Sequence, residues 1–394
     1  MGIIFSSFNG LEPKLRFPNF IEKWTRFEAE NIFKNITDKN HPTDTVLTIQ
    51  QGRGTLPRDL SGRNILYDNT NTKNYKRVQF GDFIIHLRSF EGGLEMANEQ
   101  GIVSPAYTIL RYIKPIAFGF YKAYFRTNEF INHILSKSVE GIRDGKQISY
   151  DAFKWLAIPY CQLEEQQKIA DFLSLVDQRI EKQRQLVESL KKYKRGLFLK
   201  LYNDSDKSII SFKNIYEMAS EGGTPSTSDS ENYENGKIPF IKIDDLNQHY
   251  LNFAKYFITE KGLKKSSAWI VPENSIIYSN GATIGACSIN KIPVTTKQGI
   301  LGIVPKSNFS VEFLYFFFTS SIFKQKIRAI TTKGTMDCAY LKDINGIKIS
   351  IPDFIAQQKI AKIMVDFENL IERTELSFIY LQNIKKALLQ QMFI

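Results

Sequence analysis

The chain has 394 residues and carries 52 Lys and Arg against 41 Asp and Glu, a formal net charge of +11. Its 43% hydrophobic and 24% charged residues are typical of a folded protein of two or more domains, and the basic excess favours an anionic partner, nucleic acid before membrane. No apolar run approaches the roughly 20 residues that span a bilayer, and the three Cys and four His follow no disulfide or metal-ligand spacing, so we expect a protein of the reducing cytoplasm without a metal site.

Residues 1–157 are expected to form a first α+β domain. Short runs of Ile, Val, Tyr and Phe, such as residues 81–86, predict strands, and loops rich in Gly, Asn and Ser separate them. Residues 122–135 predict a helical stretch near the end of this domain.

Residues 158–203 predict a long helix. Ile158-Pro159 precedes the sequence Gln-Gln-Lys-Ile-Ala at 166–170, and apolar residues then recur at alternating spacings of four and three, which is the a/d seam of a coiled coil. Gln183 and Lys194 interrupt the seam, and a helix of about 40 residues would be about 60 Å long. The apolar seam positions are Ile169, Leu173, Val176, Ile180, Val187, Leu190 and Leu197.

Residues 204–350 are expected to form a second α+β domain that weakly repeats the first. Residues 273–278 match the pattern of 81–86, and residues 311–330 predict a helical stretch. The Gly-rich loop at 222–226 lacks the Lys of a phosphate-binding loop, and Asp244-Asp245 is expected to serve a turn or a helix N-cap.

Residues 351–394 repeat the first long helix with an offset of 191 residues. Ile351-Pro352 precedes a second Gln-Gln-Lys-Ile-Ala at 357–361, and Thr374 and Lys385 stand where Gln183 and Lys194 stand in the first copy. The matched seams favour an antiparallel coiled coil of the two helices, and the alternative is two amphipathic helices packed on separate domain cores. The second seam comprises Ile360, Met364, Phe367, Ile371, Phe378, Leu381 and Leu388.

The sequence contains none of the catalytic motifs sought. It has no G-x-x-x-x-G-K-[ST] phosphate loop, no G-x-S-x-G nucleophile elbow and no Asn-Pro-Pro-aromatic motif of amino-methyltransferases. We therefore expect a chain that is not itself an enzyme and holds no cofactor.

The loops of both domains mix basic and amide side chains. Lys and Arg neutralise phosphates, and Arg, Asn and Gln can bond base edges, so these loops favour nucleic-acid binding over a plain solvated surface. The candidate DNA-binding residues are Arg53, Arg58, Arg63, Lys76, Arg77, Arg88, Thr224, Lys237, Lys242, Lys264, Lys265, Asn280, Lys297, Gln298 and Lys333.

These features together resemble the specificity (S) subunit of type I restriction–modification systems. The two Ile-Pro-x(n)-Gln-Gln-Lys-Ile-Ala helices look like the central and distal conserved regions of that family. The succession from Gly222-Gly223-Thr224-Pro225 through residues 236–246, 262–268 and 280–285 to Lys297-Gln298 looks like one of its target-recognition domains. The first domain departs more from the common pattern.

The resemblance implies a fold and a mechanism. It implies two α/β target-recognition domains, residues 1–157 and 204–350, separated by the helices 158–203 and 351–394 in a pseudo-two-fold repeat. Each domain would read one half of a bipartite, asymmetric site in double-stranded DNA, and the helices would set the gap. Two modification subunits with S-adenosylmethionine and restriction/motor subunits with ATP and Mg²⁺ would supply catalysis in the cytoplasm of a prokaryote.

Two other functions remain open from the sequence. A coiled-coil scaffold with two ligand-binding lobes and no DNA role would share the helices, but it gives no reason for basic and amide residues in both sets of loops. A self-contained methyltransferase or nuclease is disfavoured by the absent motifs.

Overall fold

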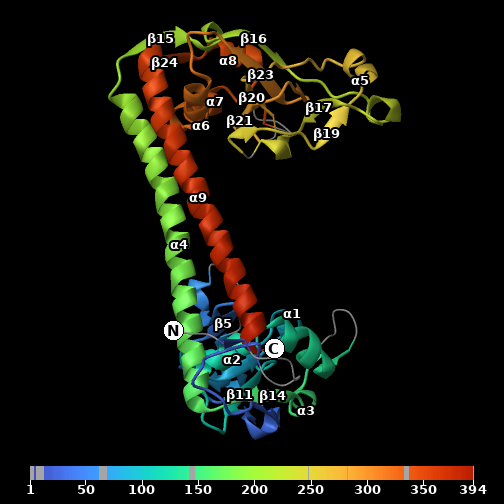
Figure 1. Cartoon of the computed structure of the whole chain (residues 1–394), viewed down its shortest axis with the longest axis vertical. Coiled ribbons are helices and arrows are strands. Elements are labelled where there is room, and N and C mark those ends of the chain that lie inside the picture. Colours follow the sequence, from blue (N-terminus) through green and yellow to red (C-terminus); the bar gives the residue numbers. More distant parts are fainter. Residues whose placement is uncertain are drawn as a thin grey trace. The chain divides into compact units, whose positions relative to one another are not determined.

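The computed structural model describes residues 4–5, 13–61, 69–141, 147–246, 248–281, 283–331 and 337–393. Its contacts group the chain into two compact units (Figure 1). Unit 1 comprises residues 1–184 and 376–394, and unit 2 comprises residues 185–375. Each unit therefore combines one α+β lobe with about half of each long helix. No described helix is both long enough and apolar enough to cross a membrane.

The two predicted long helices are present as α4 (Leu163–Asn203) and α9 (Phe354–Phe393). They begin later than the predicted residues 158 and 351, because each Ile-Pro pair lies in a strand that precedes its helix. In unit 1, Asp177 of α4 pairs with Lys385 of α9 at 2.5 Å. In unit 2, Lys191 pairs with Glu375 at 2.5 Å and Lys194 pairs with Glu368. Because partners on α9 fall in number as those on α4 rise, the paired segments run antiparallel, as predicted, and Figure 1 shows the green and red helices side by side.

The predicted seam is the less exposed face of both helices. The polar Lys194 and Lys385 of the seam each pair with an acidic residue of the other helix, and the pairs Lys194–Glu368 and Lys385–Asp177 are related by the 191-residue offset. Ile169, Leu173, Val187, Ile360, Met364 and Ile371 are buried, and Val176, Ile180, Leu190, Leu197, Phe367, Phe378, Leu381 and Leu388 are half-buried.

The lobe of unit 1 is built on a four-stranded antiparallel sheet of order β4-β11-β8-β9. Two-stranded pairs surround it, among them the hairpin β5–β6 and the pair β14–β3, which leads into α4. The elements are β1 (Ile4–Phe5), β2 (Leu15–Arg16), β3 (Thr25–Glu28), β4 (Phe33–Ile36), β5 (Leu47–Gln50), β6 (Gly54–Pro57), β7 (Lys76–Val78), β8 (Phe83–Ile85), α1 (Ser89–Gly92), β9 (Glu95–Met96), β10 (Gly101–Val103), β11 (Thr108–Tyr112), α2 (Phe118–Tyr124), β12 (Val139–Glu140), β13 (Gln147–Ile148), α3 (Tyr150–Phe153) and β14 (Ala157–Tyr160).

The lobe of unit 2 repeats that sheet and extends it. Its order β16-β23-β20-β21 corresponds to β4-β11-β8-β9, and a fifth strand, β18, is added beside β21. The elements are β15 (Lys207–Ser211), β16 (Tyr216–Glu221), β17 (Ile238–Ile241), β18 (Tyr250–Leu251), β19 (Tyr256–Ile258), α5 (Glu260–Lys264), β20 (Ile276–Ser279), β21 (Cys287–Asn290), β22 (Thr295–Thr296), β23 (Ile300–Pro305), α6 (Val311–Thr319), α7 (Ser321–Ile330), α8 (Leu341–Gly346) and β24 (Lys348–Pro352). The weak repeat seen in the sequence is thus a repeat of sheet topology.

Each predicted helical stretch of the lobes is divided at one hydroxyl residue. In unit 1, α2 ends before Thr127, whose Oγ1 donates to the Tyr124 carbonyl and accepts from the Phe130 amide, and a second helical turn follows. In unit 2, Ser320 separates α6 from α7 and accepts from the Phe323 amide. Such local capping bonds end one helix and start the next.

The first Gln of each Gln-Gln-Lys-Ile-Ala sequence ties a long helix to its lobe. Gln166 is buried, accepts from the Ala117 amide ahead of α2 at 3.1 Å and donates to the Cys161 carbonyl at 2.8 Å. Gln357 makes the equivalent bonds to the Ser310 amide and the Pro352 carbonyl. The repeated motif therefore has a structural explanation: one amide side chain satisfies backbone groups from two elements.

Replacing Gln166 with Leu is expected to lower the free energy of unfolding by about 2–4 kcal/mol, because a buried N–H and a buried carbonyl lose their partners. Denaturant unfolding of the full chain measures the loss. The matched control is Gln167→Leu at the exposed neighbour, which should change stability by less than about 0.5 kcal/mol. Equal effects of the two changes would contradict the assigned role.

The far end of each long helix completes a lobe core. In unit 1, the Phe393 ring near the end of α9 contacts the rings of Trp24, Phe120 and Tyr124, with centroids 5.1–6.2 Å apart. In unit 2, Phe198 and Tyr202 near the end of α4 contact rings of α6. The core of the first lobe is therefore completed by the end of α9, and the core of the second lobe by the end of α4.

Candidate nucleic-acid interface

Three loops of unit 2 meet at one end of its sheet. The Gly222 amide donates to the Ile300 carbonyl at 2.9 Å, and the Gly299 amide donates to a Glu221 carboxylate oxygen at 2.7 Å. The amides of Asn280 and Gly281 both donate to the Gly299 carbonyl. The loops after β16, β20 and β22 are therefore held together by their backbones.

This junction brings together three of the predicted residues with exposed side chains. Thr224, Lys297 and Gln298 are exposed, and the Gln298 amide donates to Thr224 Oγ1 at 3.4 Å. A Cβ on Gly222 would lie 2.0 Å from the Thr296 carbonyl oxygen, so only glycine permits this close approach. The arrangement offers one cation, one amide and one hydroxyl to a ligand.

Asn280 lies inside this junction and away from the surface. It is fully buried, its side-chain amide donates to the Ala339 carbonyl at 3.2 Å, and its own carbonyl accepts from the Ala339 amide. This burial corrects its placement as a surface contact, because a side chain with no exposed area holds the loop and does not reach a ligand. Lys333 lies outside the described residues.

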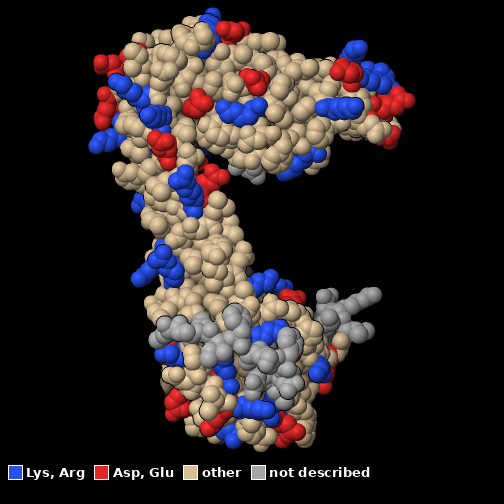
Figure 2. All heavy atoms as spheres, viewed as in Figure 1, with Lys and Arg blue, Asp and Glu red and all other residues tan. Residues whose placement is uncertain are grey.

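The other predicted lysines of unit 2 surround β17 and α5. The Lys242 ammonium lies 3.4 Å from the centroid of the Tyr256 ring. The backbone amide of Lys242 donates to the Asp245 carboxylate, so Asp245 has the turn role expected for the acidic pair. Lys237 and Lys264 are exposed, and Lys265 pairs with Asp229 at 3.6 Å. Figure 2 shows basic and acidic side chains mixed at the α5 end, which weakens its field for a polyanion.

In unit 1, the turn of the β5–β6 hairpin presents Arg53 on a rigid base. The buried carboxylate of Glu95 accepts from the amides of Gly52 and Gly54 at 2.7 and 2.9 Å, and Asn98 donates to the Arg53 carbonyl at 2.7 Å. The Arg53 residue itself is exposed. Because its backbone is fixed by two other segments, the guanidinium is offered from a preorganised position.

A polar hollow of about 530 Å³ lies beside this hairpin. Burial lowers the pKa of His86 below its usual value, so the imidazole is neutral at pH 7. Of the residues that line this hollow, only Arg88 was predicted from the sequence. Gln50 and Gln51, which immediately precede the turn that carries Arg53, were not predicted. The lining comprises Thr48, Ile49, Gln50, Gln51, Leu56, Ser61, His86 and Arg88.

The remaining cations predicted in unit 1 have protein partners or are half-buried. Lys76 donates to the Tyr107 carbonyl at 2.6 Å, and burial, with a contribution from Lys39, lowers its pKa. Arg77 pairs with Asp44 at 3.0 Å, and Arg58 is half-buried. Arg63 lies outside the described residues. The exposed candidates in unit 1 are therefore Arg53 and Arg88.

Comparison with known families links both repeats to one domain type. A family model described as the type I restriction modification DNA specificity domain matches residues 27–192 and 205–379. Each match covers most of one lobe and most of the helix that follows it in the chain, so the repeat found in the sequence coincides with two copies of this domain.

Three named relatives are similar to the chain. It is 33% identical over 192 residues to the type I restriction enzyme MjaIX specificity subunit of Methanocaldococcus jannaschii, covering 48% of this chain and 44% of that protein. It is 29% identical over 153 residues to the EcoR124I/EcoR124II specificity subunit of Escherichia coli, covering 38% of each. These two alignments span less than half of either relative. A putative type I specificity subunit of Mycoplasma genitalium, S.MgeORF438P, is 21% identical over 97% of both chains.

Solved structures share the fold over nearly the whole chain. The crystal structure of a type I restriction–modification S subunit from M. genitalium aligns with a TM-score of 0.53 and 18% identity, covering 98% of this chain and 99% of that chain. A chain from a study of complex assembly in the type I R-M system aligns with a TM-score of 0.61 and 15% identity, covering 95% and 98%. At these identities the likeness shows a common fold.

Proposed function

Because the chain belongs to the family of type I restriction modification DNA specificity proteins, we propose that it is the non-catalytic DNA-specificity subunit of such an enzyme. One observation carries the proposal: the two units share the order of four sheet strands but present different side chains at corresponding loops. The loop after β8 carries Arg88, whereas the loop after β20 begins with the buried Asn280. Two similar domains with different loops are suited to binding two different half-sites of one DNA sequence.

In this proposal each unit reads one half of a bipartite, asymmetric site in double-stranded DNA. Exposed Arg and Lys neutralise phosphates, and the amide and guanidinium groups of Gln298 and Arg53 bond base edges in the major groove. The paired helices α4 and α9 set the gap between half-sites. Two modification subunits with S-adenosylmethionine methylate adenine, and restriction/motor subunits use ATP and Mg²⁺, in the cytoplasm of a prokaryotic cell.

Mapping of methylated adenines tests the proposal. The chain is expressed with its cognate modification subunit in a host without methylation of its own, and one bipartite motif is expected throughout the genome. Replacing residues 204–350 with those of a relative should change one half of that motif and leave the other. Absence of any motif, together with no retention of DNA, would contradict the proposed function.

Lys297 and Gln298 should separate phosphate binding from base reading. Gln298→Ala is expected to weaken binding of the cognate site by about 1–3 kcal/mol and relax one base position. Lys297→Ala is expected to weaken binding to all DNA sequences by the same factor. It should also reduce the slope of log affinity against log salt concentration by about 1. Binding of the assembled complex to a panel of single-base variants at several salt concentrations measures both. If Gln298→Ala lowered the affinity for every single-base variant by the same factor, Gln298 would not be a base-reading residue.

A further inference from the structure

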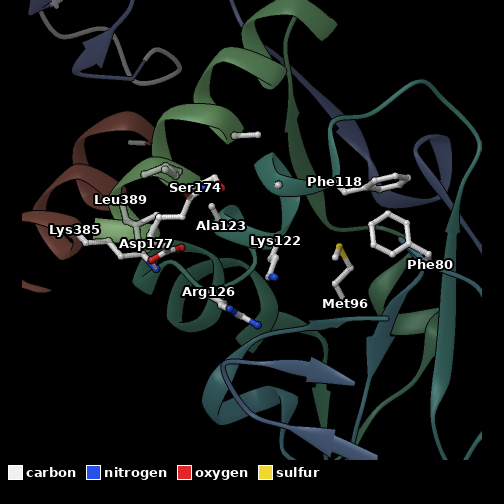
Figure 3. Close-up of a pocket in the computed structure, with 14 residues that line it drawn as sticks. Phe80, Met96, Phe118, Lys122, Ala123, Arg126, Ser174, Asp177, Lys385 and Leu389 are labelled. Atoms are coloured by element: carbon white, nitrogen blue, oxygen red, sulfur yellow. Dashed lines mark hydrogen bonds and ion pairs between the residues drawn. The ribbon is translucent and has the colours of Figure 1, made fainter. Parts of the chain in front are cut away.

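Unit 1 contains a hollow of about 370 Å³ that none of the proposed DNA contacts uses. It lies where α2, the first half of α4 and the end of α9 meet, with Met96 of β9 on one side (Figure 3). In that view Lys122 lies between an aromatic group at Phe80 and Phe118 and the paired side chains of Asp177 and Lys385. The hollow is thus apolar at one end and charged at the other.

The internal repeat provides a second copy of this place, in unit 2. Asp177–Lys385 corresponds to Glu368–Lys194, and Ala170 on α4 corresponds to Ala361 on α9. Helix α2 corresponds to α6 at an offset of 193, which aligns Lys122 with Tyr315 and Ala123 with Phe316. The equivalent surroundings can therefore be compared residue by residue.

In unit 2 aromatic side chains of the chain itself occupy this place. The His249 ring stacks on Tyr315 with centroids 4.1 Å apart and on Tyr250 at 4.0 Å, and it meets Phe316 at 5.2 Å. His249 immediately precedes β18, which begins at Tyr250, and β18 is the fifth strand that the unit 1 sheet lacks. Unit 1 has the corresponding helices, but its sheet lacks the strand that carries the aromatic side chains in unit 2.

The charges of the hollow indicate what would complement it. Arg126 pairs with Glu95, and Lys385 pairs with Asp177. Among the described residues no carboxylate lies within ion-pair distance of the Lys122 ammonium, which is half-buried. Burial, and then Arg126, lower the pKa of Lys122 below its usual value, although Asp177 and Glu95 act in the opposite direction. A carboxylate in direct contact with the ammonium would therefore stabilise its charged form.

The rim of the hollow is apolar and exposed. Phe118 in the lining makes edge-to-face contacts with Phe80 and Tyr112, and these two residues are 58% and 42% exposed, with Ile113 beside them 51% exposed. Contiguous exposed aromatics next to a pocket are typical of protein–protein interfaces, where an aromatic anchor fills the pocket. A DNA backbone has no group that would cover such a surface.

We propose that this hollow is a socket for an aromatic side chain next to a carboxylate, presented by a modification subunit. The inference rests on the proposed function, which supplies that partner. The aromatic ring takes the place that His249 and Tyr250 take in unit 2, and the carboxylate pairs with Lys122. Unit 2 also has a hollow of about 500 Å³ at the corresponding helices, lined by Val311, Glu312 and Ala361 among others. Tyr315 stands there in place of Lys122, so the two units offer different sockets and two modification subunits would be anchored unequally.

Filling the socket tests the proposal. Ala123→Phe copies Phe316 of unit 2 and is expected to weaken binding of one of two modification subunits by about 10- to 30-fold. Lys122→Glu and Phe80→Ser, which remove the cation and the exposed rim, should act in the same direction. The matched control is Ala387→Phe at an exposed position of α9. Titration calorimetry with the purified cognate modification subunit gives the affinities, and native mass spectrometry gives the stoichiometry.

The outcomes separate this inference from the proposed function. A wild-type chain that assembles and methylates a bipartite motif, with unchanged affinity in all three variants, would overturn the socket and leave the proposed function standing. A wild-type chain that does not bind the modification subunit at all would overturn both. Loss in the three variants with a retained Ala387→Phe affinity supports the socket, provided that thermal unfolding shows all four chains folded.

Discussion

Inserting one heptad into α4 between Arg184 and Gln185, and one into α9 between Glu375 and Leu376, is expected to widen the gap between the recognised half-sites by up to about three base pairs. Both half-site sequences should stay the same. Seven helical residues add about 10 Å, which is about three steps of B-DNA, and a whole heptad returns the seam to the same face. Mapping of methylated adenines in the cognate system reads out the new gap directly.

The ion pairs across the helices define the control for this insertion. The paired insertions leave Asp177–Lys385 on one side and Lys191–Glu375 on the other, so both contacts survive. A heptad in α4 alone would set the two helices out of register and should lower stability and modification together. A motif with the original gap after the paired insertion would contradict the role of the helices in spacing.

Glu165→Ala is expected to lower the free energy of unfolding by about 3–5 kcal/mol, because it leaves a buried guanidinium without its carboxylate. Arg16 donates to both oxygens of Glu165, at 2.6 and 2.8 Å, and the two side chains are 9% and 1% exposed. The bond joins β2 to the start of α4. Denaturant unfolding of the full chain measures the loss, with Glu164→Ala at the exposed neighbour as the control.

The paired replacement Arg16→Met with Glu165→Leu should recover most of this stability. An apolar pair of similar size removes both desolvation costs, although the Glu22 carbonyl loses the bond from Arg16. The repeat supports this expectation, because Ala356 occupies the position of Glu165 in the second copy. A double variant as unstable as Glu165→Ala would show that the ion pair itself holds the segment.

The long helices could be predicted in detail because their signal is local and periodic. A heptad seam repeated at a fixed offset determines both the element and its partner face, and the burial of Leu173 and Met364 follows it. The interruptions of the helices at Thr127 and at Ser320 were not predicted. A continuous apolar run predicts one helix, and a single hydroxyl residue that caps a helix end does not change that prediction. The role of Gln166 could not be predicted, because its two backbone partners belong to other segments of the chain.

The candidate interface was predictable in composition but less so in geometry. Basic and amide residues in Gly-rich loops predicted the candidate loops, and in unit 2 the structure brings Thr224, Lys297 and Gln298 together. Asn280 has the same chemistry but turns inward to the Ala339 backbone, a difference that depends on tertiary packing. Gln50 and Gln51 were missed because strand-end glutamines are common on any surface.

The closure of the unit 1 core by Phe393 has a consequence for synthesis of the protein. Trp24, Phe120 and Tyr124 leave the ribosome early, yet the ring that packs against them is added only after all of unit 2 has been translated. The first lobe to emerge therefore waits with an incomplete core until the second lobe has been made. A chain that stops before Phe393 would leave that apolar surface exposed, and exposed apolar surface favours aggregation and degradation.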